Sequence, residues 1–135
     1  MIEYGFVKWL DVDFESAVEL VKEQLICEGF SVLMMIDVKQ KLDEKLGIDF
    51  KKYVIVGACD PANACKALMA EENIGLILPC NVVVYESDGG TMVGVVRPTV
   101  AMQMIDNPDL KRIAKDVERR LKSVIDALQP VAAAS

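Results

Sequence analysis

The chain has 135 residues, of which 53% are hydrophobic and 27% are charged, so its composition is that of one globular domain rather than a disordered segment. Its formal net charge of -6 argues against binding along the phosphate backbone of DNA or RNA, which needs a basic surface. Histidine is absent from the sequence, which excludes a histidine general base, Ser-His-Asp and Cys-His arrangements, and every metal site that contains histidine.

The N-terminal sequence and the cysteine content predict a cytoplasmic protein. The first residues, MIEYGFVKWLDVDFES, lack the basic lead and apolar run of a secretory signal peptide. Apolar stretches all fall short of the roughly 20 residues that cross a bilayer, so we expect no association with membranes. In the cytoplasm the four cysteines are expected to be reduced thiols. Acid–base chemistry would have to come from carboxylates, lysine, tyrosine or these thiols.

The first part of the chain predicts a strand followed by an amphipathic helix. Residues 2–9 (IEYGFVKW) fit a strand. Asp11 or Asp13 is expected to cap a helix over residues 14–28, and Gly29 to end it in the left-handed conformation. The apolar positions of this helix fall on one stripe: Phe14, Ala17, Val18, Val21 and Leu25.

The next segment predicts a second strand and a short helix. Residues 30–36 (FSVLMMI) are almost all apolar, so we expect a buried strand. Asp37 should end this strand and cap the helix, with Gln40 in the capping-box position, and Gly47 should end the helix. The helix has one apolar edge, formed by Val38, Leu42 and Leu46.

A third apolar strand, residues 53–58, leads directly into a second short helix. Asp60 at the N-cap and Pro61 at the first helical position are a strong helix-start signal. Cys59 therefore immediately precedes a predicted helix N-terminus, which is a position where a thiolate can be stabilised.

Two further strands form a predicted hairpin. The apolar runs 81–86 and 91–96 flank an Asp-Gly pair, which is the strongest short-range hairpin signal in a sequence. Pro79 blocks a ladder position, so the first of these strands should begin at or after Cys80. We expect the two strands to be adjacent and antiparallel.

The last helix and the overall class follow from the C-terminal part. Residues 98–105 fit a short helical turn, and Asn107 with Pro108 predicts the start of a long helix. Residues 129–135 are expected to be a frayed tail. We therefore predict one α+β domain over residues 1–128, with a largely antiparallel five-stranded sheet and helices packed on one face. The last helix carries the longest apolar stripe: Leu110, Ile113, Ala114, Val117, Leu121, Val124, Ile125 and Leu128.

Three ordered motifs give the chain a family resemblance. They are the run over residues 36–53, the pattern C-x-P-x-x-A-x-x-A-L that begins at Cys59, and IGLILPCNVVVYE at 74–86. Over roughly residues 4–128 the sequence resembles domain of unknown function family 302, which usually has Asn where this chain has Asp60. The resemblance implies a TATA-binding-protein-like β-α-β(4)-α topology, here with two short extra helices, and a bacterial or archaeal origin. It implies no activity.

A candidate site combines both strand-end cysteines with two charged residues. A hairpin turn at Asp-Gly places Cys80 opposite Arg97, and a Gly-Gly turn moves Arg97 by only two positions. If the third and fourth strands are antiparallel, as the resemblance implies, Cys59 and Asp60 lie at the same end; a parallel crossover would separate them. The hypothesis is a cluster of four residues in which the helix start and Arg97 lower the pKa of a thiol: Cys59, Asp60, Cys80 and Arg97.

Three functional interpretations remain open. The chain is a homodimeric module that binds a small ligand or a soft metal at Cys59 and Cys80, because thiolates suit soft metals. Alternatively, it is a thiol-dependent enzyme, redox or nucleophilic, that uses one of these cysteines. In the third interpretation both cysteines only pack, and the function lies in a partner surface. No cofactor is indicated.

We also expect a homodimer, because the apolar content is high for a chain of this size and apolar runs need to be covered. Two surfaces are candidates for the contact. One is an edge strand of the sheet. The other is the segment 98–105, with its apolar residues Val100, Met102, Met104 and Ile105.

Overall fold

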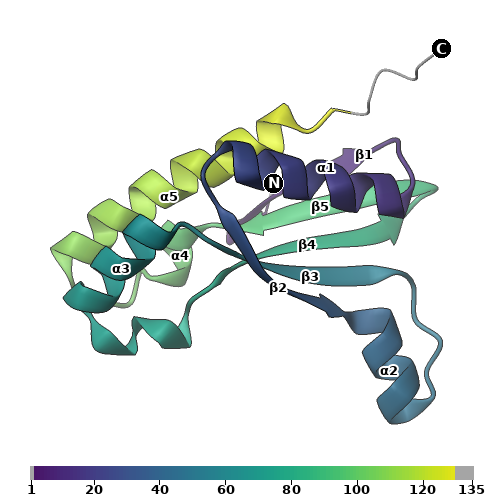
Figure 1. The fold of residues 1–135 in the computed structure, drawn as a ribbon, viewed down its shortest axis with the longest axis horizontal. Coiled ribbons are helices and arrows are strands. Elements are labelled where there is room, and N and C mark those ends of the chain that lie inside the picture. The colour runs from purple at the N-terminus through teal and green to yellow at the C-terminus, as the bar shows by residue number, and fades with distance from the viewer. Residues whose placement is uncertain (1, 130–135) are drawn as a thin grey trace.

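The computed structural model describes residues 2–129, and its core is a sheet with the strand order β1-β5-β4-β3-β2 (Figure 1). Each neighbouring pair of strands is antiparallel. The strands are β1 (Gly5–Leu10), β2 (Ser31–Asp37), β3 (Tyr53–Cys59), β4 (Cys80–Ser87) and β5 (Gly90–Val96). The helices are α1 (Phe14–Cys27), α2 (Val38–Leu46), α3 (Pro61–Ala70), the 3-10 helix η1 (Glu72–Leu76), α4 (Pro98–Ala101) and α5 (Pro108–Ala127). The predicted α+β class and antiparallel sheet are confirmed.

The main core lies between one face of the sheet and the helices α1 and α5, which run side by side across that face (Figure 1). Alternate residues of the three central strands point into it, as the period of two requires. They are Val54, Val56, Ala58, Cys80, Val82, Val84, Val93 and Val95, and all are buried. The C-terminal part of the predicted α5 stripe faces them, with Val117, Leu121, Val124 and Ile125 buried. Leu110 and Ala114 are buried in a second cluster with Ala67, Ile74 and Met102.

The β4–β5 hairpin has the register that an Asp-Gly turn predicts. Ser87 pairs with Gly90, and the register continues to Val82 opposite Val95. Both turn residues have positive φ, 50° at Asp88 and 77° at Gly89, which is the conformation that a two-residue hairpin turn requires. The end of β4 near Cys80 is therefore fixed relative to the residue that follows β5.

The expectation of a buried strand at 30–36 is wrong. The sheet order places β2 at an edge, beside β3, and residues 33–37 are all exposed. Leu33 is 62% exposed and lies where the register with β3 shifts between Val32 and Met34. A short apolar run has the same pattern in a central strand and in an apolar edge strand, so periodicity could not distinguish them.

Three smaller expectations also need correction. The first strand begins at Gly5 rather than at residue 2. Asp60 occupies the N-cap position of α3 but makes no side-chain capping hydrogen bond. Besides the expected short helices after Asp37 and Asp60 and the helical turn expected within 98–105, which is α4, the chain forms the 3-10 helix η1. Nearly all of the tail predicted at 129–135 lies outside the described residues. Within residues 2–129, none of the helices has the length and apolarity that spanning a bilayer requires.

We predict that Leu121→Ala lowers the free energy of unfolding by about 2–5 kcal/mol, since the side chain is fully buried between α5 and the sheet. Urea denaturation of the two proteins measures the change. Leu76→Ala is the matched control, because Leu76 is 89% exposed and its loss should change stability by less than about 0.5 kcal/mol. A loss below about 1 kcal/mol at Leu121 would contradict the assignment of α5 as a core helix.

Candidate functional site

The cysteines Cys59 and Cys80 lie at the same end of the sheet. Strands β3 and β4 are antiparallel, with Ala58 opposite Cys80, so the parallel alternative is excluded. Both cysteines line one small cavity beneath the starts of α3 and α4, and α5 closes it from above. Its volume of about 20 Å³ is enough for one water molecule, so the cavity has no room for a larger ligand in this conformation.

Burial dominates the electrostatics of both thiols. It raises the pKa of Cys80 from 9.0 to about 11, with a smaller contribution from the neighbouring Cys59. Burial also raises the pKa of Cys59, and the Asp60 carboxylate adds to this effect. The hypothesis of a lowered thiol pKa is therefore wrong in direction, because desolvation outweighs any stabilisation of a thiolate by the start of α3. Both thiols are protonated and poorly nucleophilic at neutral pH.

Asp60 is engaged in a polar cluster instead of capping α3. Its carboxylate forms an ion pair with Arg120 of α5 and accepts a hydrogen bond of 2.7 Å from Asn63 Nδ2. The side chains of Arg120 and Asp60 are only 20% and 9% exposed. Arg120 also donates to the carbonyl oxygen of Glu28 and lies over the ring of Phe30, 4.9 Å from its centre. The cluster therefore joins α5, the start of α3 and the end of α1.

Arg97 belongs to a second cluster, separate from the thiols. Its Nε donates to Glu118 Oε2 at 3.2 Å, and its guanidinium lies over the ring of Phe6. The other Glu118 oxygen accepts hydrogen bonds from the Thr99 backbone N–H at 3.0 Å and from its hydroxyl at 2.6 Å, so Glu118 holds the start of α4. Of the four predicted site residues, the cavity brings together Cys59, Asp60 and Cys80, and Arg97 does not line it.

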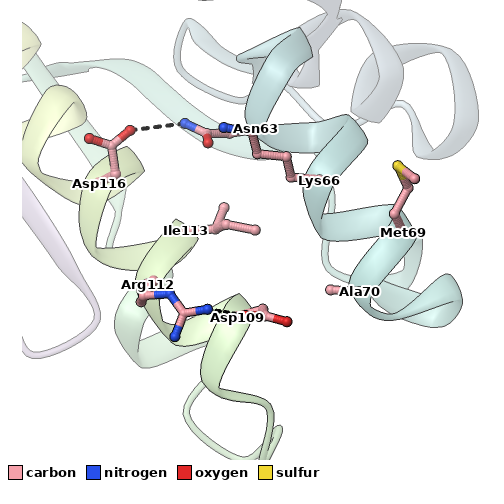
Figure 2. A pocket seen from close by; sticks show the side chains of 8 residues that line it. All are labelled: Asn63, Lys66, Met69, Ala70, Asp109, Arg112, Ile113 and Asp116. Atoms are coloured by element: carbon pink, nitrogen blue, oxygen red, sulfur yellow. Dashed lines mark hydrogen bonds and ion pairs between the residues drawn. The ribbon is translucent and has the colours of Figure 1, made fainter.

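A larger groove lies between α3 and α5 (Figure 2). Its volume is about 590 Å³. Residues of both helices line it, and Figure 2 labels them: Asn63, Lys66, Met69, Ala70, Asp109, Arg112, Ile113 and Asp116. Sequence reasoning missed this groove. Its lining mixes polar residues with Met69, Ala70 and Ile113, and only the packing of α3 beside α5 brings them together.

Asn63 and Ile113 line both the groove and the thiol cavity, so these two residues form the partition between them. Asn63 Nδ2 donates to Asp60 at 2.7 Å and to Asp116 at 3.0 Å. Hydrogen bonds from Arg119 and then from Asn63 hold the pKa of Asp116 below its usual value. The partition therefore consists of Asn63, which two carboxylates hold in place, and the apolar side chain of Ile113.

A metal site has little support within a single chain. Over residues 2–129, no group of three or more cysteines and carboxylates is arranged to hold a metal ion. Two thiols fall short of the four ligands of a closed zinc site, so a metal would need ligands from another molecule.

Comparisons with known proteins identify a family, but they indicate no activity. The family model described as domain of unknown function DUF302 matches residues 7–128. The chain is similar to a crystal structure of an uncharacterized conserved DUF302 protein from Bacillus stearothermophilus, with a TM-score of 0.85 and 36% sequence identity. That similarity covers 93% of this chain and 98% of the other. No curated protein matches the chain.

We predict that Arg120→Met destabilises the protein by about 3–5 kcal/mol, because it leaves the buried carboxylate of Asp60 without its ion-pair partner. Arg119→Met is the matched control. Arg119 is adjacent on the same helix, but its pair with Asp116 is exposed, and its loss should cost at most about 1 kcal/mol. Equal losses in the two variants, measured by urea denaturation, would contradict the structural role of the Asp60–Arg120 pair.

We predict that Cys80 makes stability fall at high pH. Because its folded pKa lies above the unfolded value, its contribution is fully present below about pH 9 and is lost as the pH rises through about 11. The loss is about 2–3 kcal/mol relative to Cys80→Ala, a variant that lacks this titration. Urea denaturation of both proteins between pH 8 and about 11 measures the difference. A constant difference over that range would show that Cys80 is not buried as described.

Proposed function

We propose that this chain, which belongs to the DUF302 family, is a cytoplasmic, homodimeric domain that binds a small amphipathic carboxylic acid in the groove between α3 and α5. The carrying observation is the size and composition of that groove. At about 590 Å³ it falls within the range of roughly 300–1,000 Å³ that is typical of small-molecule sites. The thiol cavity behind it accommodates only a water molecule.

The charges around the groove favour an anionic ligand group. Asp109 is paired with Arg112, and Asp116 accepts hydrogen bonds from Arg119 and Asn63. Lys66 has no carboxylate within ion-pairing distance among residues 2–129, although it lines the groove (Figure 2). A carboxylate on the ligand would complete this pairing.

The apolar side chains that line the groove define the rest of the ligand. Met69, Ala70 and Ile113 contribute a surface on which a short alkyl chain can pack. Met69 is largely exposed, and an unbranched thioether side chain adapts to ligands of different shape. A small acid with an apolar tail matches both features.

The thiol-dependent enzyme is the weaker alternative. A nucleophilic or redox-active cysteine needs an accessible thiolate, whereas burial raises the pKa of both Cys59 and Cys80 and Cys80 is almost fully buried. The cytoplasmic assignment is supported by the cysteines, since all four are free thiols, as expected in a reducing compartment.

We predict that hexanoate binds with a dissociation constant of about 1 mM or lower, measured by isothermal titration calorimetry. Lys66→Gln should weaken binding about tenfold, because it removes one charge-assisted hydrogen bond worth roughly 1.5 kcal/mol. Lys115→Gln is the control, since this lysine lies on α5 but outside the groove.

Hexylamine tests whether the negative charge of the ligand, rather than its apolar tail, determines binding. It has the same number of carbon atoms as hexanoate and the opposite charge, so it should bind much more weakly beside Lys66. Equal binding of the two compounds, or no effect of Lys66→Gln on hexanoate, would contradict the proposed carboxylate site.

A further inference from the structure

The segment β2–α2, residues 31–46, is apolar and almost uncovered by the rest of the chain. Four consecutive large apolar residues of β2, Leu33 to Ile36, are each at least 38% exposed. Edge strands of monomeric proteins usually carry a lysine or proline that prevents pairing with another chain, and β2 has neither. An apolar edge of this kind needs a partner.

Helix α2 adds to the same uncovered surface. None of its residues is buried, although both of its ends are well defined. Asp37 accepts a hydrogen bond of 3.0 Å from the Gln40 backbone N–H, and Gly47 has the left-handed conformation that ends a helix. Leu46, on its apolar edge, is 66% exposed. In Figure 1, α2 stands apart from the layer of α1 and α5. Since a nine-residue helix is marginal in isolation, α2 needs a surface to pack on.

The charge distribution of α2 favours a second copy of the chain as that surface. The first half of the helix carries Lys39 and Lys41, and the second half carries Asp43, Glu44 and Lys45, so the two halves are net basic and net acidic. The helix dipole favours the opposite distribution, with acidic residues near the N-terminus. When two copies of α2 lie antiparallel, the basic half of each faces the acidic half of the other and the two dipoles oppose each other.

Strand β2 leads to the same arrangement. Its one charged residue is Asp37, at the C-terminal end, and Ser31 is at the other end. Antiparallel copies place Asp37 beside Ser31 of the other copy, whereas parallel copies would place the two aspartates together. The register shift between Val32 and Met34 interrupts a continuous ladder along the outer edge, so side-chain packing rather than backbone hydrogen bonding dominates the contact.

We propose that β2 and α2 form an isologous two-fold interface, in which each element packs antiparallel against its counterpart in a second copy of the chain. This inference deepens the proposed function, because it assigns the surface of the homodimer named there. It does not depend on ligand binding in the groove, which is lined by α3 and α5. It selects the edge strand over the segment 98–105 as the dimer contact.

Sedimentation velocity at about 50 µM tests the interface, since a stable dimer of this kind has a micromolar or lower dissociation constant. The wild-type chain should sediment as a dimer, and Leu33→Lys and Leu46→Lys should each convert it to a monomer. Ile26→Lys is the matched control: Ile26 is 65% exposed, like Leu46, but lies on α1, and this variant should remain a dimer. A monomeric wild type, or a dimer that tolerates both lysines, overturns the proposal.

A charge exchange tests the antiparallel arrangement. Lys41→Glu and Glu44→Lys should each weaken the dimer, because each variant places like charges together across the axis. An equimolar mixture of the two variants should recover dimerisation, since opposite charges then face each other in the mixed dimer. Failure of the mixture to recover overturns the antiparallel assignment. Circular dichroism of each variant checks that α2 still forms, because Lys41 and Glu44 also form a 3.7 Å pair within the helix.

Hexanoate titration of the Leu46→Lys variant separates this inference from the proposed ligand. A monomeric variant that still binds hexanoate supports the interface and leaves the groove intact. A monomeric wild type that binds phosphatidylglycerol vesicles overturns the interface, since β2–α2 would then be a membrane-binding surface. A dimeric wild type that does not bind hexanoate would contradict only the proposed ligand.

Discussion

The two ion pairs that join α5 to residues outside the helix, within the described range 2–129, are the constraint on which the rest of the site depends. Glu118 and Arg120 lie two residues apart on this helix, and each binds a residue that directly follows a strand of the sheet. Glu118 holds Arg97 after β5, and Arg120 holds Asp60 after β3. The starts of α4 and α3 are therefore fixed on either side of Val117, which lines the thiol cavity between them.

This anchoring explains both the inert thiols and the open groove. With α3 and α4 held against α5, Cys80 is desolvated and its pKa rises. Beside the same contact, α3 and α5 leave space between them, where the groove forms (Figure 2). Asn63 belongs to both regions, because it bridges Asp60 and Asp116. A change in the anchoring should therefore affect the cavity and the groove together.

Local sequence patterns correctly predicted the elements that depend mainly on residues close to them in the sequence. The Asp88-Gly89 turn needs only its own backbone conformation, and the stripe of α5 is long enough to identify its buried face. The antiparallel β3–β4 pair, which the family resemblance implied, brought Cys59 and Cys80 to one end of the sheet.

The missed features depend on contacts between distant parts of the chain. Asp60 and Arg120 are 60 positions apart, so the sequence could not show that this carboxylate would be an ion-pair partner rather than a helix cap. Arg97 pairs with Glu118 and does not line the thiol cavity. The position of Glu118 depends on how α5 crosses the sheet. The exposure of β2 follows from sheet order, and an apolar run contains no information about which strands flank it.

Thiol labelling of Cys80 tests the anchoring most directly. Iodoacetamide modification at pH 8, located by mass spectrometry, would be compared between the wild type, Arg120→Met and Arg119→Met. If Arg120 holds the start of α3 over the cavity, Cys80 in Arg120→Met reacts faster than global unfolding allows, and the other two proteins protect it. Labelling of Cys80 only at the rate of global unfolding in all three proteins would contradict this account.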